Sequence, residues 1–227
     1  MTRVHIVVEG LSERSFVNNV LAPVLWRHQV YLNPIVVGLP GQKGGGVSYA
    51  RAQKDILLRL KQDRFAYCST MLDFYGLGKG FPGTPLPTNL SNLDKVIHIE
   101  QAVKQDIIAH APELRADVRF IPYLQLHEYE ALLFSNPAAF AGGINQSNLA
   151  SQFQSIRDGF PTPEDIDDSP NTAPSKRVLD LCPSYSKVLD GTRAAIAVSV
   201  DTMRRECAHF RDWLTRLEHI GAQVQLR

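Results

Sequence analysis

Short apolar runs alternate with helical patterns along the first half of the chain. Four runs rich in β-branched residues predict buried strands, at 4–8, 33–37, 67–72 and 118–124. Between them, apolar residues recur every three or four positions, which predicts helices over about 13–28, 47–63 and 95–110. Ser12 is a suitable N-cap for the first of these helices, and Pro23 predicts a kink within it. This β-α-β-α-β order predicts an α/β fold with a parallel sheet and helices on both faces.

The second half of the chain is more polar and more helical. Residues 138–176 are weakly apolar and rich in Gln, Ser, Asn, Asp and Pro, which predicts a helical insertion ending in a loop at 167–175. Helical periodicity returns from 186 to 219, with a break near Cys207–Phe210. We therefore expect one α/β domain over 1–227, with an insertion at about 138–176 and C-terminal helices at about 186–219.

The charge balance and the cysteines indicate how the protein could bind nucleic acid and in which compartment it resides. The chain has 227 residues, with 24 Lys and Arg against 23 Asp and Glu, so no global positive field attracts nucleic acid and such binding would need a local patch. The three cysteines are widely spaced and no secretory apolar region follows Met1, which predicts a reduced, cytoplasmic protein. Cys68 is expected to be a buried thiol in the third strand. No apolar run approaches the roughly 18 residues that a membrane helix needs, so no membrane association is expected.

Acidic residues follow three of the predicted strands. Glu9 ends the first, Asp73 ends the third, and Glu128 and Glu130 come just after the fourth. The carboxyl ends of parallel strands meet at one edge of a sheet, where sites form. Crowded carboxylates repel each other, and a hard cation with oxygen ligands relieves that repulsion. Because no Cys/His set has zinc spacing, Mg²⁺ or Mn²⁺ fits best.

Two residues near these acids have more than one interpretation. Glu13 lies four residues after Glu9. Its carboxylate either lies beside that of Glu9 at the carboxyl edge of the sheet or only complements the dipole of its helix. His127 is either a ligand or general base, or a hydrogen-bonded structural residue.

Basic and glycine-rich segments supply candidate phosphate contacts. The loop Gly41–Gly46 lies between a strand and a helix, which favours a phosphate cradle or a simple connector; it lacks the Gly-Lys-Ser/Thr of a Walker A loop. Lys43 and Lys79 are candidates for contacting a backbone phosphate. Lys176 either stabilises a phosphate beside the metal or is a solvated helix-start charge.

Several motifs together resemble domain-of-unknown-function family 4276. That family is regarded as related to TOPRIM domains, the metal-binding fold of topoisomerases, primases and overcoming-lysogenization-defect nucleases. The motifs cover about residues 4–214: VEGLSE (8–13), GGGVSYARAQKDI (44–56), MLDFYGLGKGFPG (71–83), IPYLQLHEYEALLFSNP (121–137), NTAPSKRVL (171–179) and CAHFRDWL (207–214).

The resemblance implies a TOPRIM-like Rossmannoid fold and a set of site residues. Its pattern has a Glu after the first strand, matched by Glu9, and in the nuclease branch a second Glu four residues later, matched by Glu13. It then has Asp-x-Asp after a later strand, where this chain has Asp73-Phe74-Tyr75 and lacks the second Asp. The nearest matches to the branch's later acid and lysine are Glu128 or Glu130 and Lys176. Related genes often neighbour AAA- or ABC-type ATPases in anti-phage defence loci, which implies an ATPase partner.

These inferences favour a Mg²⁺-dependent TOPRIM-like nuclease or phosphodiesterase acting on nucleic acid, as an effector of phage defence. Glu9, Asp73 and Glu128 are expected to hold the metal, with Glu13 or Glu130 completing the set or acting as general base and Lys176 stabilising the phosphate. Two alternatives remain: a non-catalytic binding or regulatory subunit of an ATPase complex, and a phosphohydrolase of small nucleotides.

Overall fold

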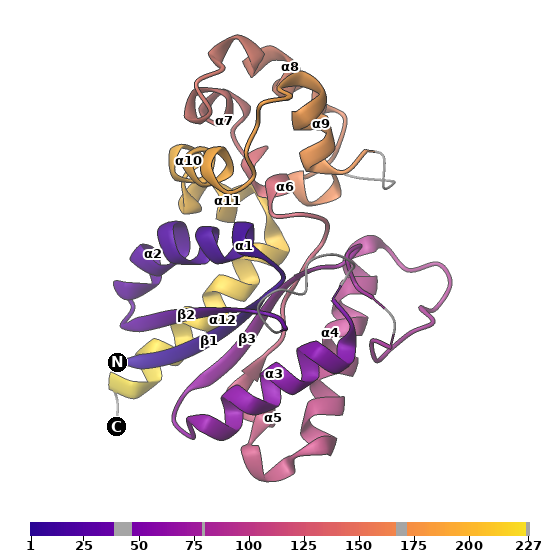
Figure 1. Ribbon diagram of the computed structural model, residues 1–227, viewed down its shortest axis with the longest axis vertical. Helices are drawn as coiled ribbons and strands as arrows, with labels where there is room; N and C mark the ends of the chain where they lie inside the picture. The colour runs from indigo at the N-terminus through magenta and orange to yellow at the C-terminus, as the bar shows by residue number, and fades with distance from the viewer. Residues whose placement is uncertain (39–46, 79, 167–171, 226–227) are drawn as a thin grey trace.

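A five-stranded sheet forms the centre of the α/β part of the molecule (Figure 1). The computed structural model describes residues 1–38, 47–78, 80–166 and 172–225. The strand order is β2-β1-β3-β4, with β5 also pairing with β3, and every pairing is parallel. The strands are β1 (Thr2–Val8), β2 (Val30–Val36), β3 (Tyr67–Asp73), β4 (Phe120–Ile121) and β5 (Leu124–Gln125).

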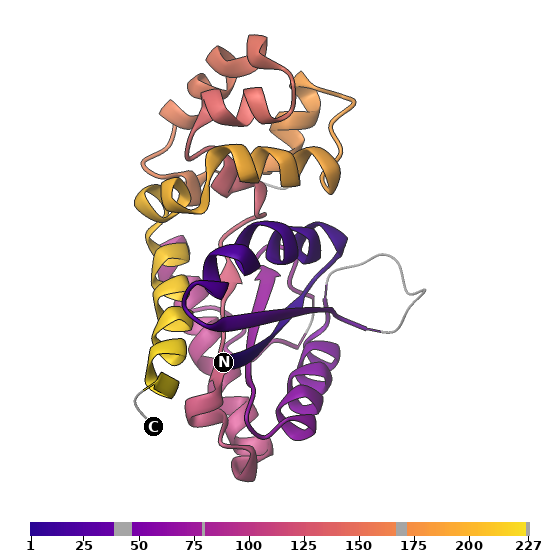
Figure 2. The same cartoon turned by 90° about the vertical axis from the view of Figure 1, so that its left-hand side faces the viewer.

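Helices cover both faces of this sheet, as Figures 1 and 2 show. Val4, Ile6 and Val8 of β1 pack into a core with the helices of one face, whereas Val7 packs into a second core with those of the other. The first face carries α1 (Leu11–Phe16), a π-helical segment (Val17–Leu21), α2 (Ala22–Trp26) and α12 (Ala208–Gln225). The second face carries α3 (Tyr49–Gln62) and α4 (Asn92–His110), and a 3₁₀ turn (Pro112–Leu114) and α5 (Ala116–Arg119) lead from α4 to β4. The predicted α/β class, a parallel sheet with helices on both faces, is thereby confirmed.

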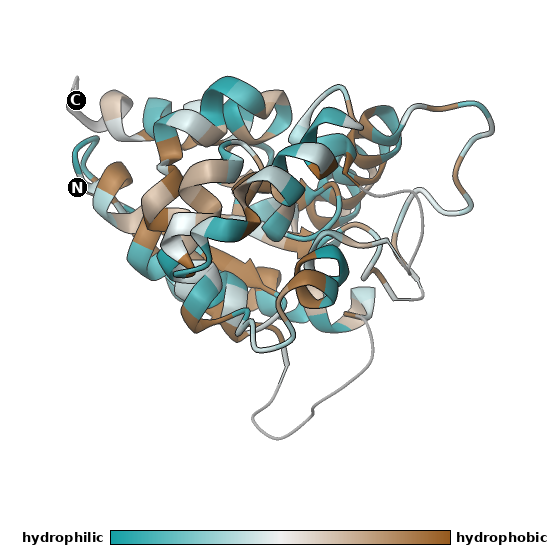
Figure 3. Ribbon diagram, turned by 90° about the horizontal axis from the view of Figure 1, so that it is seen from above, coloured by the Kyte–Doolittle hydropathy of each residue, from teal (hydrophilic) through white to brown (hydrophobic). Residues whose placement is uncertain are grey.

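A separate layer of helices lies beyond the carboxyl edge of the sheet (Figure 1). It contains α6 (Glu130–Leu133), α7 (Pro137–Gly143), α8 (Ala150–Asp158), α9 (Pro174–Leu181), α10 (Leu189–Val198) and α11 (Val200–Glu206), with 3₁₀ turns at Ser147–Leu149 and Pro163–Asp165. Helix α10 packs against α7 and against α1. Phe134, Phe140 and Phe153 of this layer belong to the same buried cluster as Ile6 of the sheet. Seen from above, hydrophobic ribbon lies mainly toward the middle of the molecule, and the outer helices carry much of the hydrophilic ribbon (Figure 3). We propose on this basis that the chain is one domain carrying an insertion at about 138–176.

Two local predictions were wrong in detail: the start of the first helix and the continuity of the fourth strand. The first helix begins at Leu11, one residue before the predicted cap, because the backbone N–H of Gly10 donates to Glu13 Oε2 at 2.9 Å and so closes the helix start. The single strand expected at 118–124 is divided into β4 and β5. Pro122 has no N–H for a ladder bond, and the Thr70 hydroxyl bridges the gap by bonding both the N–H (2.9 Å) and the carbonyl (2.8 Å) of Tyr123.

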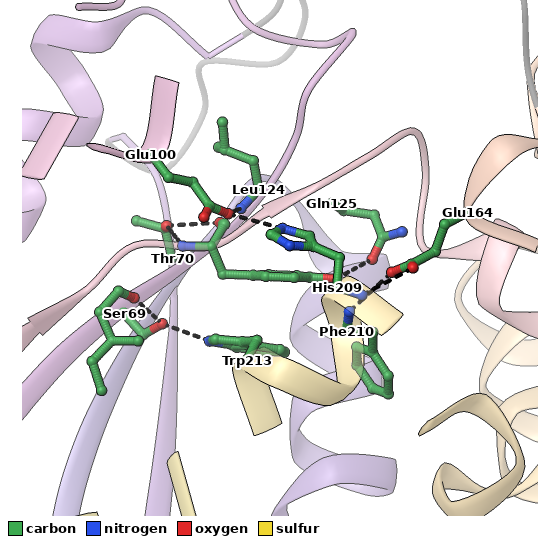
Figure 4. A network of polar contacts seen from close by, with 11 residues as sticks. Ser69, Thr70, Glu100, Leu124, Gln125, Glu164, His209, Phe210 and Trp213 are labelled. Carbon is green, nitrogen blue, oxygen red and sulfur yellow. Dashed lines mark hydrogen bonds and ion pairs between the residues drawn. The ribbon is translucent and has the colours of Figure 1, made fainter. Parts of the chain in front are cut away.

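A buried polar network fastens the helical layer and α12 to the sheet (Figure 4). The Glu164 carboxylate accepts the backbone N–H groups of His209 (3.0 Å) and Phe210 (2.9 Å) at the start of α12. His209 Nε2 lies 3.0 Å from Glu100 Oε1 of α4, which also accepts the N–H of Leu124. Burial lowers the pKa of His209, but the hydrogen bond and the charge of Glu100, together with the charge of Glu164, outweigh burial, so the pKa is raised. A buried hydrogen-bonded pair therefore links the two faces.

The Glu164 carboxylate, which caps the start of α12, is expected to contribute measurably to the free energy of unfolding. Replacing Glu164 with alanine leaves two buried N–H groups without an acceptor, so we expect the free energy of unfolding to fall by about 1–3 kcal/mol. Chemical denaturation measures the change, with Glu113→Ala as a matched control because Glu113 is an exposed residue of a 3₁₀ turn. An unchanged denaturation midpoint for Glu164→Ala would show that the cap does not hold the layers together.

Candidate functional site

Three of the predicted acids line one pocket at the carboxyl edge of the sheet. The pocket has a volume of about 290 Å³, and Glu9, Asp73 and Glu128 contribute to its wall together with His127. Parallel pairing explains this convergence, since Val8 of β1 lies beside Met71 of β3, and Asp73 lies beside Gln125 of β5. The remaining lining residues are Tyr75, Gly76 and Ala173.

Gly76 allows the turn after β3 to approach Glu9. A Cβ atom at this position would lie 3.0 Å from Glu9 Oε2, a spacing that real side chains rarely tolerate. The N–H of Gly76 donates to the carbonyl of Asp73 at 3.0 Å, which closes the turn. A glycine here therefore lets the two acidic strand ends come close together.

Glu13 and Glu130 lie behind the pocket as buried acids. Glu13 lies in the first turn of α1 and is 7 % exposed. Its carboxylate accepts the N–H of Gly10, and its charge raises the pKa of Asp73. Glu130 opens α6 and is 1 % exposed. Both therefore stand within electrostatic reach of the pocket acids.

Burial and mutual repulsion raise the pKa values of these carboxyl groups. Burial first, and then the charge of Glu13, raises the pKa of Glu9 to about 7. Burial raises the pKa of Glu130 to about 8, and burial with the charges of Glu13 and Glu9 raises the pKa of Asp73 well above its usual range. Glu9 Oε2, Asp73 Oδ1 and Glu130 Oε1 are buried and have no hydrogen-bond donor. These three oxygens thus lack the hydrogen-bond donors that would satisfy them.

Among the described residues, Lys187 brings a positive charge to this cluster. Its Nζ lies 2.7 Å from Glu128 Oε1 and 3.9 Å from Glu130 Oε1. Burial would raise the pKa of Glu128, but the ammonium of Lys187 and hydrogen bonds from Ser175 outweigh it, so the pKa lies below its usual value. Ser175 N donates to Glu128 Oε2 at 2.9 Å. Glu128 is therefore the acid of this group that is held ionised by partners within the chain.

The helical layer fixes Lys187 through its backbone. The Tyr129 hydroxyl donates to the carbonyl of Lys187 at 2.6 Å. Gly191, in the first turn of α10, makes room for that hydroxyl, since a Cβ at 191 would lie 1.9 Å from it. Sequence reasoning missed Lys187 because it lies 57 residues beyond Glu130, in a segment with no motif of its own.

The other predicted phosphate contacts have separate outcomes. Lys176 is an exposed residue in the first turns of α9 and makes no ion pair with the acids of the described chain. His127 is 1 % exposed and its ring stacks on Tyr75, with centroids 5.0 Å apart and planes 14° apart. Lys43 and Lys79, with the whole of the Gly41–Gly46 loop, lie outside the described residues.

The donor chemistry fits a hard cation, although no coordination shell is assembled. Within residues 1–38, 47–78, 80–166 and 172–225, no three His, Cys, Asp or Glu side chains form a group that could hold a metal ion. Buried carboxylate oxygens without donors are nevertheless the ligand type that Mg²⁺ and Mn²⁺ prefer. The divalent-metal site at Glu9, Asp73 and Glu128 therefore stays a prediction.

The raised pKa values predict that stability falls with pH in the absence of divalent metal. A carboxyl group with a folded pKa of about 7 or 8 against an ordinary value of 4.5 binds its proton more tightly when folded. The stabilising contribution of these two carboxyl groups is therefore fully present below about pH 4.5. As the pH rises toward 8, the free energy of unfolding falls by a few kcal/mol. Denaturation in EDTA from pH 5 to pH 8 measures this, and a Glu9→Gln/Glu130→Gln variant should flatten the profile. A wild-type profile that is already flat would contradict the assignment.

Together the parallel sheet, its covering helices and the acidic pocket define an α/β protein with a carboxylate site at the strand ends. The chain belongs to the family described as Domain of unknown function (DUF4276), whose model matches residues 8–218. The resemblance seen in its motifs is thereby confirmed.

Solved structures with similar folds include two C-terminal regions of OLD proteins. The region from Xanthomonas campestris pv. campestris is 16% identical, with a TM-score of 0.48 over 100% of this chain and 99% of that chain. The region from Burkholderia pseudomallei is 15% identical, with a TM-score of 0.47 over 97% of this chain and 99% of that chain. Among curated proteins, no relative matches the chain. In the part of the chain that the structure describes, no helix is both long enough and apolar enough to cross a membrane.

Proposed function

We propose that the protein is a TOPRIM-like phosphodiesterase that depends on Mg²⁺ or Mn²⁺ and acts on nucleic acid. The observation that carries this proposal is the convergence of Glu9, Asp73 and Glu128 on one pocket, with buried oxygens of Glu9 and Asp73 left without donors. A phosphodiester is an anion that such a site attracts only when a cation neutralises the carboxylates. A catalytic function therefore accounts for an arrangement that costs stability in the free chain.

In this proposal each side chain of the site has a separate role. Glu9, Asp73 and Glu128 would hold the cation, which supplies positive charge to the phosphate and lowers the pKa of attacking water. Glu130, with a pKa of about 8, can hold or release a proton near neutral pH. Lys187 takes the role first considered for Lys176, because its ammonium reaches the acids and can face the phosphate oxygens. Glu13 keeps the start of α1 closed and adds negative charge behind the pocket.

Location and partnership complete the proposal. The free, buried cysteines 68, 182 and 207 suit a reducing cytoplasm, and the thiol of Cys68, with its pKa raised to about 12 by burial, is inert. An AAA- or ABC-type ATPase partner and a role in phage defence rest on the resemblance described for the sequence.

A non-catalytic subunit is the second candidate, favoured by a specific observation. Lys187 already neutralises Glu128, and no three metal-binding side chains of the described chain stand together. In that case the pocket would be a structural ion-pair cluster within an ATPase complex.

Cleavage assays separate these functions. Labelled single-stranded and duplex DNA and RNA, and mononucleotides, are incubated with the purified chain in Mg²⁺, in Mn²⁺ and in EDTA. Metal-dependent cleavage of polynucleotides supports the phosphodiesterase. Turnover of mononucleotides alone would support the small-nucleotide phosphohydrolase, and no turnover with any metal or substrate would favour the subunit.

A further inference from the structure

A second pocket adjoins the acidic one and differs from it in chemistry. It has a volume of about 320 Å³ and lies between the loop after β3 and the first half of α4. Tyr75 lines both pockets, so the two share a wall. Its principal lining residues are Phe74, Tyr75, Leu77, Phe81, Leu86 and Lys95.

The lining combines the aromatic rings of Phe74, Tyr75 and Phe81 with aliphatic side chains. The rings of Phe74 and Tyr75 meet edge to face, with centroids 5.2 Å apart and planes 70° apart. One face of the Tyr75 ring stacks on His127, but the residue is 50% exposed, so the rest of the ring is available to a ligand. Phe81 is held from behind by Tyr49 of α3, at 5.3 Å between centroids. Flat heteroaromatic groups bind such walls by stacking, and every nucleobase offers a face of that kind.

One charged side chain completes the described lining of this pocket. Lys95 lies in the first turn of α4, where its Nζ donates to Asn92 Oδ1 at 3.2 Å. An ammonium group at the edge of an aromatic pocket suits a ligand that joins an aromatic ring to an anion. The volume is that of a small-molecule site, and it is too small for a base-paired duplex.

We propose that this aromatic pocket binds one unpaired nucleobase of a nucleotide whose neighbouring phosphate lies at the acidic pocket. The inference rests on the proposed function and deepens it, because it names the substrate as single-stranded or unpaired. This ligand fits because Tyr75 lines both pockets, so a base bound in the aromatic pocket places its sugar-phosphate backbone beside the carboxylates of the acidic pocket. The same base-plus-phosphate chemistry is offered by a single-stranded polynucleotide and by a free nucleotide.

The test uses 2-aminopurine, a fluorescent base whose emission changes on stacking. The full chain is titrated in Mg²⁺, because the acidic pocket attracts a phosphate only when a cation neutralises its carboxylates. The ligand is a single-stranded oligonucleotide that carries one 2-aminopurine and has phosphorothioate linkages, which resist hydrolysis. A parallel titration uses the 2-aminopurine nucleoside monophosphate. We compare wild type with Tyr75→Ala, Tyr75→Phe, Leu86→Trp, which fills the pocket, and Phe65→Ala. Phe65 is the matched control because it is 88% exposed and precedes β3, at the opposite end of that strand. Thermal unfolding verifies that each variant is folded.

The expected result is quenching that saturates, with at least fivefold weaker binding for Tyr75→Ala and Leu86→Trp, and wild-type binding for Tyr75→Phe and Phe65→Ala. Tight binding of the oligonucleotide but not of the monophosphate supports the polynucleotide as the source, and the reverse supports the free nucleotide. Binding that none of the pocket variants changes would overturn the pocket while leaving the phosphodiesterase standing. Absence of binding by both ligands would also overturn it. Pocket-dependent binding without cleavage in any metal would uphold the pocket and remove the proposed catalysis.

Discussion

Replacing Asp73 with asparagine is expected to reduce metal-dependent phosphodiester cleavage by a factor of about 100 or more. Asp73 contributes a buried oxygen without a donor to the acidic pocket, at the end of a central strand. An amide keeps the shape of the side chain but cannot supply the negative charge that a hard cation requires. Initial cleavage rates at saturating Mg²⁺ measure the effect. Asp117→Asn, an exposed acid of α5, is the control and should retain the wild-type rate.

The same substitution should make the metal-free protein more stable. Burial and the charges of Glu13 and Glu9 disfavour the Asp73 carboxylate, so a neutral amide removes a repulsive group. We expect the free energy of unfolding in EDTA at pH 8 to rise by about 1–3 kcal/mol. Loss of cleavage together with a gain in stability separates a functional acid from a structural one. Undiminished cleavage by a stable Asp73→Asn variant would remove this pocket from the mechanism.

Replacing Lys187 with methionine is expected to cost both stability and activity. Methionine keeps most of the length of the side chain but removes the ammonium that lies 2.7 Å from Glu128 Oε1. Because Lys187 is 39% exposed, we expect a moderate loss of about 1–3 kcal/mol in the free energy of unfolding near pH 8. The loss should shrink toward pH 5, where Glu130 carries its proton.

Lys176→Met provides the matched control for this prediction. Lys176 is exposed on α9, so its replacement should leave both stability and cleavage rate unchanged. If Lys176→Met, and not Lys187→Met, lowered the cleavage rate, the original interpretation of the sequence would be restored and Lys187 would be a structural partner of Glu128.

The sheet and its acidic edge could be predicted from the sequence because both follow from local patterns. Apolar β-branched runs located β1, β2 and β3, and the acids that follow β1 and β3 lie on one edge because parallel strands point the same way. The fourth strand was predicted less well, since the break at Pro122 and the bridging hydroxyl of Thr70 depend on a neighbouring strand rather than on local periodicity.

The partner of Glu128 could not be predicted in the same way. Lys176 stands in a recognisable motif, whereas Lys187 is brought to the pocket by the packing of α10 against α1 and by a hydrogen bond from Tyr129. The aromatic pocket likewise depends on Phe74, Tyr75 and Phe81 meeting the side of α4, a contact that no local pattern encodes. Long-range packing thus supplied the cation and the second pocket, whereas local sequence supplied the acids.

Calorimetric titration with Mg²⁺ and Mn²⁺ tests the central claim most directly. Wild type is compared with Glu9→Ala/Asp73→Ala, each with and without a single-stranded oligonucleotide. The account predicts saturable metal binding by wild type that the double variant loses. Absence of metal binding by wild type, even with the oligonucleotide present, would contradict it and leave the acidic pocket as a structural cluster.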